Sequence, residues 1–413
     1  MGSCRQVAMA PTPTETTHEM PPESLRARHS VVAVAALFFV NGATFSNWLP
    51  RIPEIRDRLG LGDAGLGATL LGGGLGGIIG ALTVARMLGP LGSRRLLIGA
   101  ATALSIGMPF IGLVPVAPLL LALLTLLGTL DVYNDVSMNA QGVMVQQHIG
   151  RSIMNRLHAM WSLGFTGGAV VGSAAAAAHI DIRIHLGVVG LLLLTTVFVV
   201  QRWLVPNDAH VEPLPHEGTG RRRFATSPAM VAMGFAALAA ISLEVLPNDW
   251  SAVLMRDVFK AGRFSGLGTV ACAGAMLVGR LGGDHVLDRV GEERLLRGAL
   301  VVVAAGTVIT VAAPVTALGV LGLVVWGLGL SVVFPQLYAT AARLPGTSAG
   351  AGLGSMLLGQ RLGAMLTAVA TGALAQWVDL RFAFAVIAVV AFGVLSVTLH
   401  RASAAKHVSI DSV

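Results

Sequence analysis

Long apolar runs separated by short polar segments dominate the hydrophobic pattern of this chain. The runs can be divided at charges, prolines and polar turns, and most are near the roughly 20 residues that a helix needs to cross about 30 Å of hydrocarbon. The divisions predict twelve membrane helices, near residues 29–50, 63–86, 95–113, 117–147, 151–178, 185–204, 226–250, 264–287, 293–312, 315–342, 348–377 and 382–400.

The longest polar internal segment, VPNDAHVEPLPHEGTGRRRFATS, falls between the sixth and seventh predicted helices and marks a boundary between two halves. The fold class that follows is an all-α membrane protein built from two six-helix bundles. The predicted parts are a disordered cytoplasmic tail at 1–27, bundles at 28–204 and 226–401, a cytoplasmic linker at 205–225 and a cytoplasmic tail at 402–413.

The two halves repeat short sequence patterns at matching places, which predicts that the bundles are pseudo-symmetric. The corresponding segments are GLG at 65–67 and 266–268, RRLLIGA at 94–100 and ERLLRGA at 293–299, LGFTGGA at 163–169 and LGQRLGA at 358–364, and the pairs Arg56, Asp57 and Arg256, Asp257. Repeated halves of this kind are typical of transporters that rock around a site at the middle of the membrane.

Composition supports a membrane protein and excludes several other classes. The chain is 54% hydrophobic and only 12% charged, with a mean hydropathy of +0.75, and its 51 glycines suit helices that pack closely in lipid. It has no soluble domain to house an enzyme and no phosphate-binding loop for ATP. Its two cysteines, Cys4 and Cys272, form no framework for a metal, and we expect no cofactor.

The net charge of +7 carries information about topology and does not indicate nucleic acid, because the basic residues cluster at the ends of apolar runs. If both termini are cytoplasmic, 19 of the 28 Lys and Arg residues lie on the cytoplasmic side and 8 on the other. This bias predicts that the chain begins and ends inside the cell.

Two groups of motifs resemble the major facilitator superfamily. The segment GRLGGDHVLDRVGEERLL after the eighth predicted helix is similar to that family's cytoplasmic loop pattern, whereas the loop after the second helix has Gly89 where the pattern has Asp. The details LDVYNDVSMNAQG, RLHAMWSLG and NWLPRIPEI resemble the fucose-permease-like branch and its many bacterial members.

The resemblance covers the chain after its first tail and implies a transporter of the bacterial inner membrane. It also implies an acidic coupling residue on the fourth helix, which corresponds to Asp131 here. The residues that it assigns to cytoplasmic gating loops are Arg94, Arg95, Asp284, Asp288, Arg289 and Arg294.

Asp131 and Asp135 are four residues apart in the fourth predicted helix, so they share one helix face. At about 1.5 Å per residue, Asp131 lies about 20 Å along the helix from Pro118, near the middle of the bilayer. A carboxyl group there can take up and release a proton as a cavity opens to either side, so we predict that Asp131 carries proton coupling. The alternative is a structural carboxylate that pairs with an arginine or an asparagine. For Asp135 we expect an ion pair with Arg156 or Arg151.

Two acids and an arginine in the second half add to this picture. Glu244 and Asp249 flank Pro247, where we expect a kink; Glu244 is predicted to be a second coupling site or a gate partner, and Asp249 a cap. Arg361 is the one basic residue placed in the middle of the membrane, where it needs a negative partner or an anionic ligand. The predicted substrate-binding residues are Asn41, Asn47, Asn134, His158, Trp161, Trp326, Gln336, Gln360 and Arg361.

These features predict a secondary transporter that moves a small polar, sugar-like solute by alternating access in symport with protons. Its expected partners are the solute, H⁺ and the lipid bilayer, and we expect a monomer. One alternative is proton-driven efflux of drugs or metabolites. Another is a membrane receptor or scaffold that moves nothing, although such a protein would need neither repeated halves nor acids in the membrane.

Overall fold

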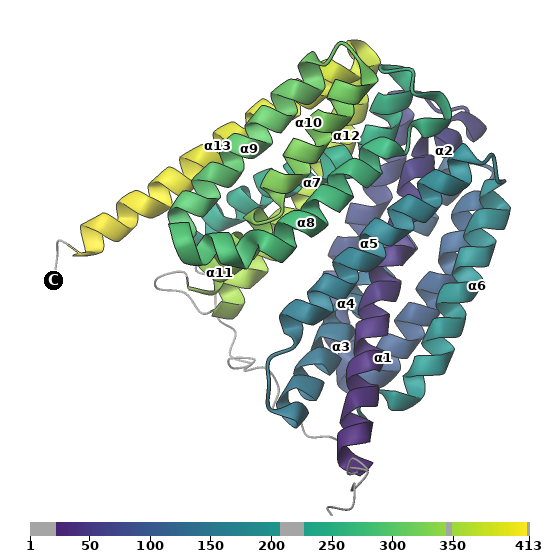
Figure 1. The fold of residues 1–413 in the computed structure, drawn as a ribbon, viewed down its shortest axis with the longest axis vertical. Helices are drawn as coiled ribbons and strands as arrows, with labels where there is room; N and C mark the ends of the chain where they lie inside the picture. Colours follow the sequence, from purple (N-terminus) through teal and green to yellow (C-terminus); the bar gives the residue numbers. More distant parts are fainter. Residues whose placement is uncertain (1–21, 207–226, 344–348, 411–413) are drawn as a thin grey trace, which may run out of the picture.

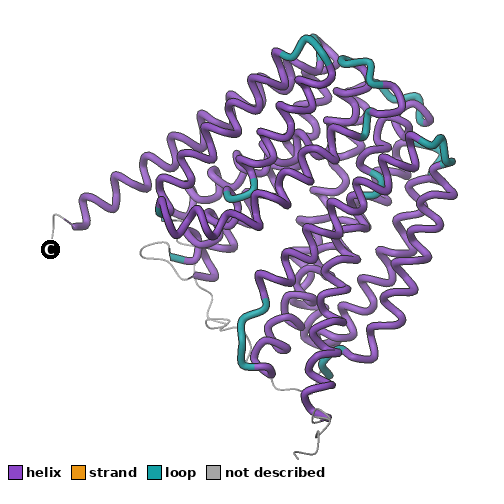
Figure 2. Tube along the Cα trace, viewed as in Figure 1, coloured by secondary structure: helices purple, strands orange, loops and turns teal. Residues whose placement is uncertain are grey.

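The computed structural model describes residues 22–206, 227–343 and 349–410. Most of the predicted N-terminal tail and linker, and the end of the C-terminal tail, therefore lie outside the described residues. The described part is helical throughout, as Figure 2 shows. Its longer helices are α1 (Pro22–Ser46), α3 (Asp63–Gly107), α4 (Ala117–Ile149), α5 (Met154–Ala177), α6 (Ile182–Val200), α7 (Pro228–Asp257), α8 (Leu267–Val290), α9 (Glu292–Ala312), α10 (Thr316–Leu330), α12 (Ala349–Trp377) and α13 (Leu380–Ile410).

Shorter elements join or extend these helices. They are η1 (Leu49–Arg51), α2 (Ile52–Arg58), η2 (Met108–Gly112), η3 (Gln201–Trp203), η4 (Gly262–Phe264) and α11 (Val333–Ala342). Ten helical stretches in the described ranges are long and apolar enough to cross a membrane. One of them, 63–112, contains two predicted helices, and α5 is not among the ten, so each of the twelve predicted helices has a counterpart.

Local signals in the sequence set several helix ends. The Ser227 hydroxyl accepts a hydrogen bond from the Met230 amide at 3.2 Å and caps α7, whose first residue is Pro228. The helix then continues through Pro247 to Asp257. The expected end near residue 250 is therefore wrong, and Asp249 lies inside the helix and does not cap it.

The backbone repeats itself where the sequence does. Gly92 bends α3 with φ 69° and ψ 165°, and Gly291 separates α8 from α9 with φ 78° and ψ 162°. Both glycines adopt a positive φ that other residues rarely take, and each precedes one of the matching arginine-rich segments. The same turn therefore connects corresponding helices in the two halves.

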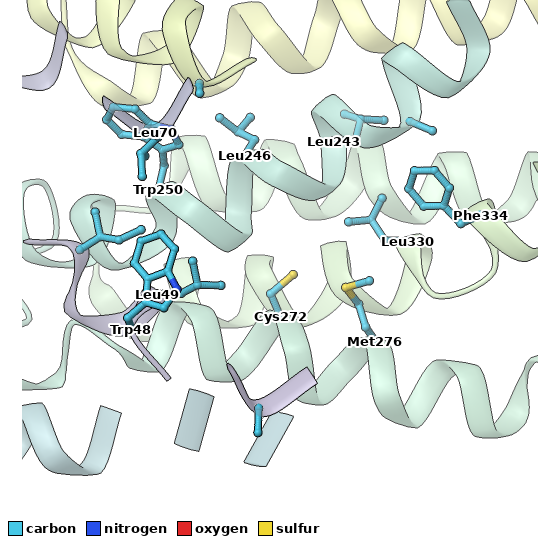
Figure 3. Packing of buried hydrophobic residues seen from close by; sticks show 14 of the residues in the cluster. Trp48, Leu49, Leu70, Leu243, Leu246, Trp250, Cys272, Met276, Leu330 and Phe334 are labelled. Carbon is cyan, nitrogen blue, oxygen red and sulfur yellow. The ribbon is translucent and has the colours of Figure 1, made fainter. Parts of the chain in front are cut away.

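Two bundles, α1–α6 and α7–α13, meet at the end where α2 lies and diverge towards the opposite end, where α1 begins (Figure 1). We call these the α2 end and the wide end. Apolar packing closes the α2 end, where Trp48 and Trp250 are both buried. Figure 3 shows Trp48, Leu49, Leu70 and Trp250 gathered at one end of the buried cluster, with Leu243, Cys272, Met276, Leu330 and Phe334 further along it.

Glycines allow α3 and α4 to lie against each other within the first bundle. A Cβ added to Gly76 would lie 2.0 Å from the carbonyl oxygen of Thr125 on α4, whereas one added to Gly73 would meet nothing within 4 Å. Because lipid supplies no hydrophobic force between helices, such close backbone contact replaces it.

We expect Gly76→Ala to destabilise the purified protein by about 1–3 kcal/mol, because the added methyl group overpacks the α3–α4 contact. Gly73→Ala on the same helix is the matched control and should leave the thermal unfolding midpoint within about 1 °C, since its methyl group enters open space. Thermal unfolding in detergent measures both. Equal midpoints for the two variants would contradict the contact.

Candidate functional site

The most extensive helix contacts between the bundles are those of α3 with α12 and of α5 with α8. Near the α2 end the first pair touches so closely that a Cβ on Gly67 would lie 2.4 Å from the carbonyl oxygen of Ala368. In the second pair the Thr166 hydroxyl donates a hydrogen bond to the carbonyl oxygen of Ala273 at 3.3 Å. The bundles are therefore in direct contact from the α2 end to about half their length.

An arginine from the second bundle lies at the far end of each contact. On α12, Arg361 lays its side chain against Gly77 of α3, where a Cβ would lie 2.7 Å from the arginine Cδ. On α8, Arg280 donates from Nη1 to the Ser162 hydroxyl of α5 at 3.0 Å. Towards the wide end the bundles diverge (Figure 1). The site thus has a charged wall on the side of the second bundle.

The first bundle faces this wall with a chain of hydrogen bonds. Asn41 of α1 donates from Nδ2 to Oδ1 of Asp131 on α4 at 3.0 Å. The same amide accepts from the Trp161 indole of α5 at 2.7 Å. We call this set the Asp131–Asn41–Trp161 chain. Both ends of the Asn41 amide are occupied, which favours the interhelical role over the predicted substrate contact.

A small pocket lies between the bundles where Trp161 and Arg280 meet. Its volume is about 10 Å³, room for about one water molecule, and its lining includes Trp161, Ser162, Thr166, Glu244 and Arg280. The Arg280 guanidinium carbon lies 6.0 Å from the centre of the Trp161 ring, at the limit of a cation–π contact. The predicted residues Trp161 and Glu244 therefore share one cavity wall, although they come from different bundles.

Asp135 lies one turn from Asp131 but has different partners from those predicted. Its Oδ1 accepts a hydrogen bond from the Asn139 side chain at 3.1 Å, and it interacts electrostatically with Asp131 and Arg361. An ion pair with Arg156 or Arg151 is not among the salt bridges within the described ranges, and both arginines are exposed. The expected local pairing is therefore wrong, and Asp135 belongs electrostatically to the site.

Arg280 is the functional candidate that the sequence interpretation missed. Counting charges to assign topology placed it with the loop that follows the eighth predicted helix, but α8 continues to Val290. Two signals could have identified it: the apolar run around it, and the spacing of Gly279 and Gly283, which pack α8 against α10 and the turn after it. It lies opposite α5 much as Arg361 lies opposite α3.

Several predicted substrate residues lie in the packed interior of a bundle. Trp326 is fully buried in α10, and its indole donates to the Leu243 carbonyl at 3.0 Å. Asn47 contacts His185 of α6 at 3.2 Å, and Asn134 lies beside the Met138 sulfur at 3.8 Å. Trp326 and Asn47 thus join helices within their own bundles, Asn134 contacts a residue of its own helix, and none of the three lines the pocket.

The remaining predicted residues divide between core and cavity. Gln336 of α11 is buried at 7% exposure. His158 is exposed on α5, where its ring packs edge-on against Phe38. Gln360, beside Arg361, accepts from the Tyr338 hydroxyl at 3.5 Å, and Tyr338 in turn interacts electrostatically with Arg361 and Glu244.

The residues predicted for gating loops lie at the wide end, where the bundles are apart. Arg94 donates to the Gln201 carbonyl at 3.2 Å within its own bundle. The others with described side chains, Arg95, Asp288, Arg289 and Arg294, are exposed, and the side chain of Asp284 lies outside the described residues. In this conformation the loops make contacts within one bundle, such as the pair of Glu292 with Arg343 at 2.9 Å.

At the α2 end, unlike at the wide end, a symmetric set of charged residues connects the two bundles. Arg256 of α7 holds both carboxylate oxygens of Asp57 on α2, at 2.6 and 3.0 Å, and Arg56 of α2 pairs with Asp257 of α7 at 2.6 Å. These four residues are the two Arg-Asp repeats of the sequence. We call them the charge quartet. Each half supplies one arginine and one aspartate, and the two arginines each reach across to the other half.

Comparisons with known proteins give one consistent picture. A family model described as Major Facilitator Superfamily matches residues 34–356. An uncharacterized transporter, y4wD of Sinorhizobium fredii, is 28% identical over 362 residues, which cover 86% of this chain and 93% of the relative.

Solved structures agree in fold. The nucleoside transporter NupG is similar with a TM-score of 0.67 at 13% identity, covering 90% of this chain and 98% of that one. A bacterial homologue of the human lysosomal transporter Spinster, in an inward-facing and occupied conformation, gives 0.66 at 14% identity, covering 90% and 96%.

We expect reversal of one charge in the quartet to favour opening of the α2 end. Ser173 is only 7% exposed at the contact between α5 and the start of α8, so a cysteine introduced there (Ser173→Cys) reports opening of this end. Alkylation of that cysteine by a maleimide should be about two- to fivefold faster when Arg256→Asp is also present. Exposed ion pairs contribute about 0.2–1 kcal/mol, which sets this range. Adding Asp57→Arg to Arg256→Asp restores an ion pair with the two charges exchanged, and should restore slow alkylation. A double variant no slower than Arg256→Asp alone would show that the pair does not hold this end closed.

Proposed function

The chain belongs to the major facilitator superfamily, whose members are secondary transporters and not enzymes, and on that premise we propose that it moves a small polar, hydroxylated solute in symport with protons. The carrying observation is the Asp131–Asn41–Trp161 chain, which connects an acid in the membrane to the cavity wall between the bundles.

Alternating access supplies the transport step in this proposal. The bundles are in contact at the α2 end and at Arg361 and Arg280, and they diverge towards the wide end, so this conformation is closed at the α2 end. Separation of the charge quartet, with approach of the loops at the wide end, would reverse the access. The excess of basic residues near the wide end supports a cytoplasmic location for that end, and the proposal therefore treats this conformation as inward-facing.

Proton coupling follows from the position of Asp131. An ionised Asp131 accepts the hydrogen bond from Asn41, whereas a protonated carboxyl group has an O–H of its own to donate. Protonation removes the negative charge that strengthens the hydrogen bond from Asn41, and this change can pass through the Asn41 amide to its hydrogen bond with Trp161 in the pocket wall. Solute binding and proton binding then act on the same three side chains.

The class of solute rests on the resemblance to the fucose-permease-like branch and on the groups in the cavity. Trp161 stacks on Phe165 with ring centres 5.3 Å apart, which offers an apolar face for a sugar ring. Ser162, Thr166 and Gln360 supply hydroxyl and amide groups that can bind hydroxyls. These residues support a sugar-like solute in preference to an apolar drug.

Proteoliposomes on a solid-supported membrane test this function. Addition of a solute from a panel of monosaccharides and their acid derivatives should produce a transient current in the wild type, and Asp131→Asn should reduce the current at least tenfold, since the proton carrier is lost. Glu293→Gln, which removes an exposed acid paired with Arg297, is the control and should keep the wild-type current. Undiminished proton-driven current in Asp131→Asn would remove the coupling assignment.

The membrane orientation is tested separately. In a bacterial host, a fluorescent protein fused to the C terminus should be fluorescent and alkaline phosphatase fused there should be inactive, because both termini are assigned to the cytoplasm. Fusion of each reporter after Gly112, at the α2 end, should give the reverse pattern. The opposite result would place the wide end outside the cell.

A further inference from the structure

We propose that the solute carries an anionic group, in the manner of a sugar acid, and that Arg361 binds it. This inference rests on the proposed transport function and specifies its substrate class. Arg361 lies in the middle of α12, half-buried at the site where the two bundles separate. An arginine at that depth requires a negative partner, because an unpaired charge in the membrane is costly.

The described contacts leave the Arg361 guanidinium available. Among the residues that the structure describes, it forms no ion pair and no hydrogen bond, and its nitrogens are not sealed from water. Its Cδ, Nε and Nη1 atoms nevertheless pack against Gly77 of α3. The group is thus positioned by packing and has its donors free, as a binding residue requires.

The two carboxylates in range do not take up these donors. Asp131 and Asp135 both interact electrostatically with Arg361, but their side-chain hydrogen bonds come from Asn41 at 3.0 Å and Asn139 at 3.1 Å. Each carboxylate is thus held by an amide from its own bundle. When Asp131 gains a proton, the arginine loses a counter-charge, and an anion entering the cavity can replace it.

Arg280 provides the contrast that singles out Arg361. It donates to Ser162, lies at the edge of the Trp161 ring and interacts electrostatically with Glu244 in the same pocket. Tyr338 and Gln360, next to Arg361, add a hydroxyl and an amide beside the free guanidinium. A solute could place its carboxylate on Arg361 and its hydroxyl groups on Tyr338 and Gln360.

The experiment is a thermal-shift and transport comparison of matched probes, D-gluconate and D-glucuronate against D-glucose, on the purified full-length protein. At equal concentration the acids should raise the unfolding midpoint of the wild type and glucose should not. Arg361→Gln should weaken binding of the acids about 10- to 100-fold, as loss of a charged hydrogen bond implies. Arg361→Lys should retain part of the affinity, because it keeps the charge but not the paired donors.

Arg297→Gln, which removes an exposed arginine of the same bundle, should bind the acids as the wild type does. The comparison of acids with glucose on the wild-type protein tests the anionic preference even if Arg361→Gln fails to fold. A current with glucose and none with either acid would overturn the anionic site and leave the transport function standing. Equal affinity for the acids in Arg361→Gln and wild type would also overturn it. If neither the acids nor glucose gave a thermal shift or a current with the wild type, the result would count against both the anionic site and the transport function.

Discussion

Helices in lipid gain nothing from burying apolar side chains against one another, so close contact at small residues has to hold this molecule together. The contact is closest where glycine meets a backbone carbonyl, as Gly76 does within the first bundle and Gly67 does between the bundles. It also determines where the bundles separate. At Gly77 the neighbouring atoms belong to the side chain of Arg361, and towards the wide end the two halves diverge (Figure 1).

A second constraint concerns the polar groups that this arrangement encloses. The first bundle satisfies its central acid internally, through Asn41, and connects that amide to the Trp161 indole. The second bundle leaves the half-buried Arg361 without a hydrogen bond or ion pair among the described residues. The two walls are therefore unlike although the halves are related by a repeat, because the first bundle presents carboxylates and the second presents arginines.

The helices could be predicted because hydropathy is a local property of the chain. The turn at Gly92, which joins two predicted helices into α3, could also have been found, since the same glycine recurs at 291. The boundaries at the membrane surface were less predictable. Charge counting placed Arg280 in a loop, because a basic residue near a helix end and one inside a cavity are identical in composition.

The orientation of side chains within the bundles was the hardest part to predict. Trp326 and Trp161 both lie in apolar helices, and only packing decides that one is fully buried while the other lines the pocket. Helices that are hydrophobic on every side give no periodic signal for the face that borders a cavity. The contrast between Asp131 and Asp135 has the same origin, because partners on other helices cannot be read from spacing along one helix.

The charge quartet has an implication for how easily the molecule can change shape. In each half the arginine is followed directly by an aspartate, and within one half Arg256 already contacts Asp257 at 3.0 Å while Arg56 lies 3.7 Å from Asp57. When the halves part, every guanidinium can therefore remain beside the acid that follows it in the chain. Opening of the α2 end would therefore leave no unpaired charge in either half. Exchange of ion-pair partners within the quartet would keep the energy cost of opening low.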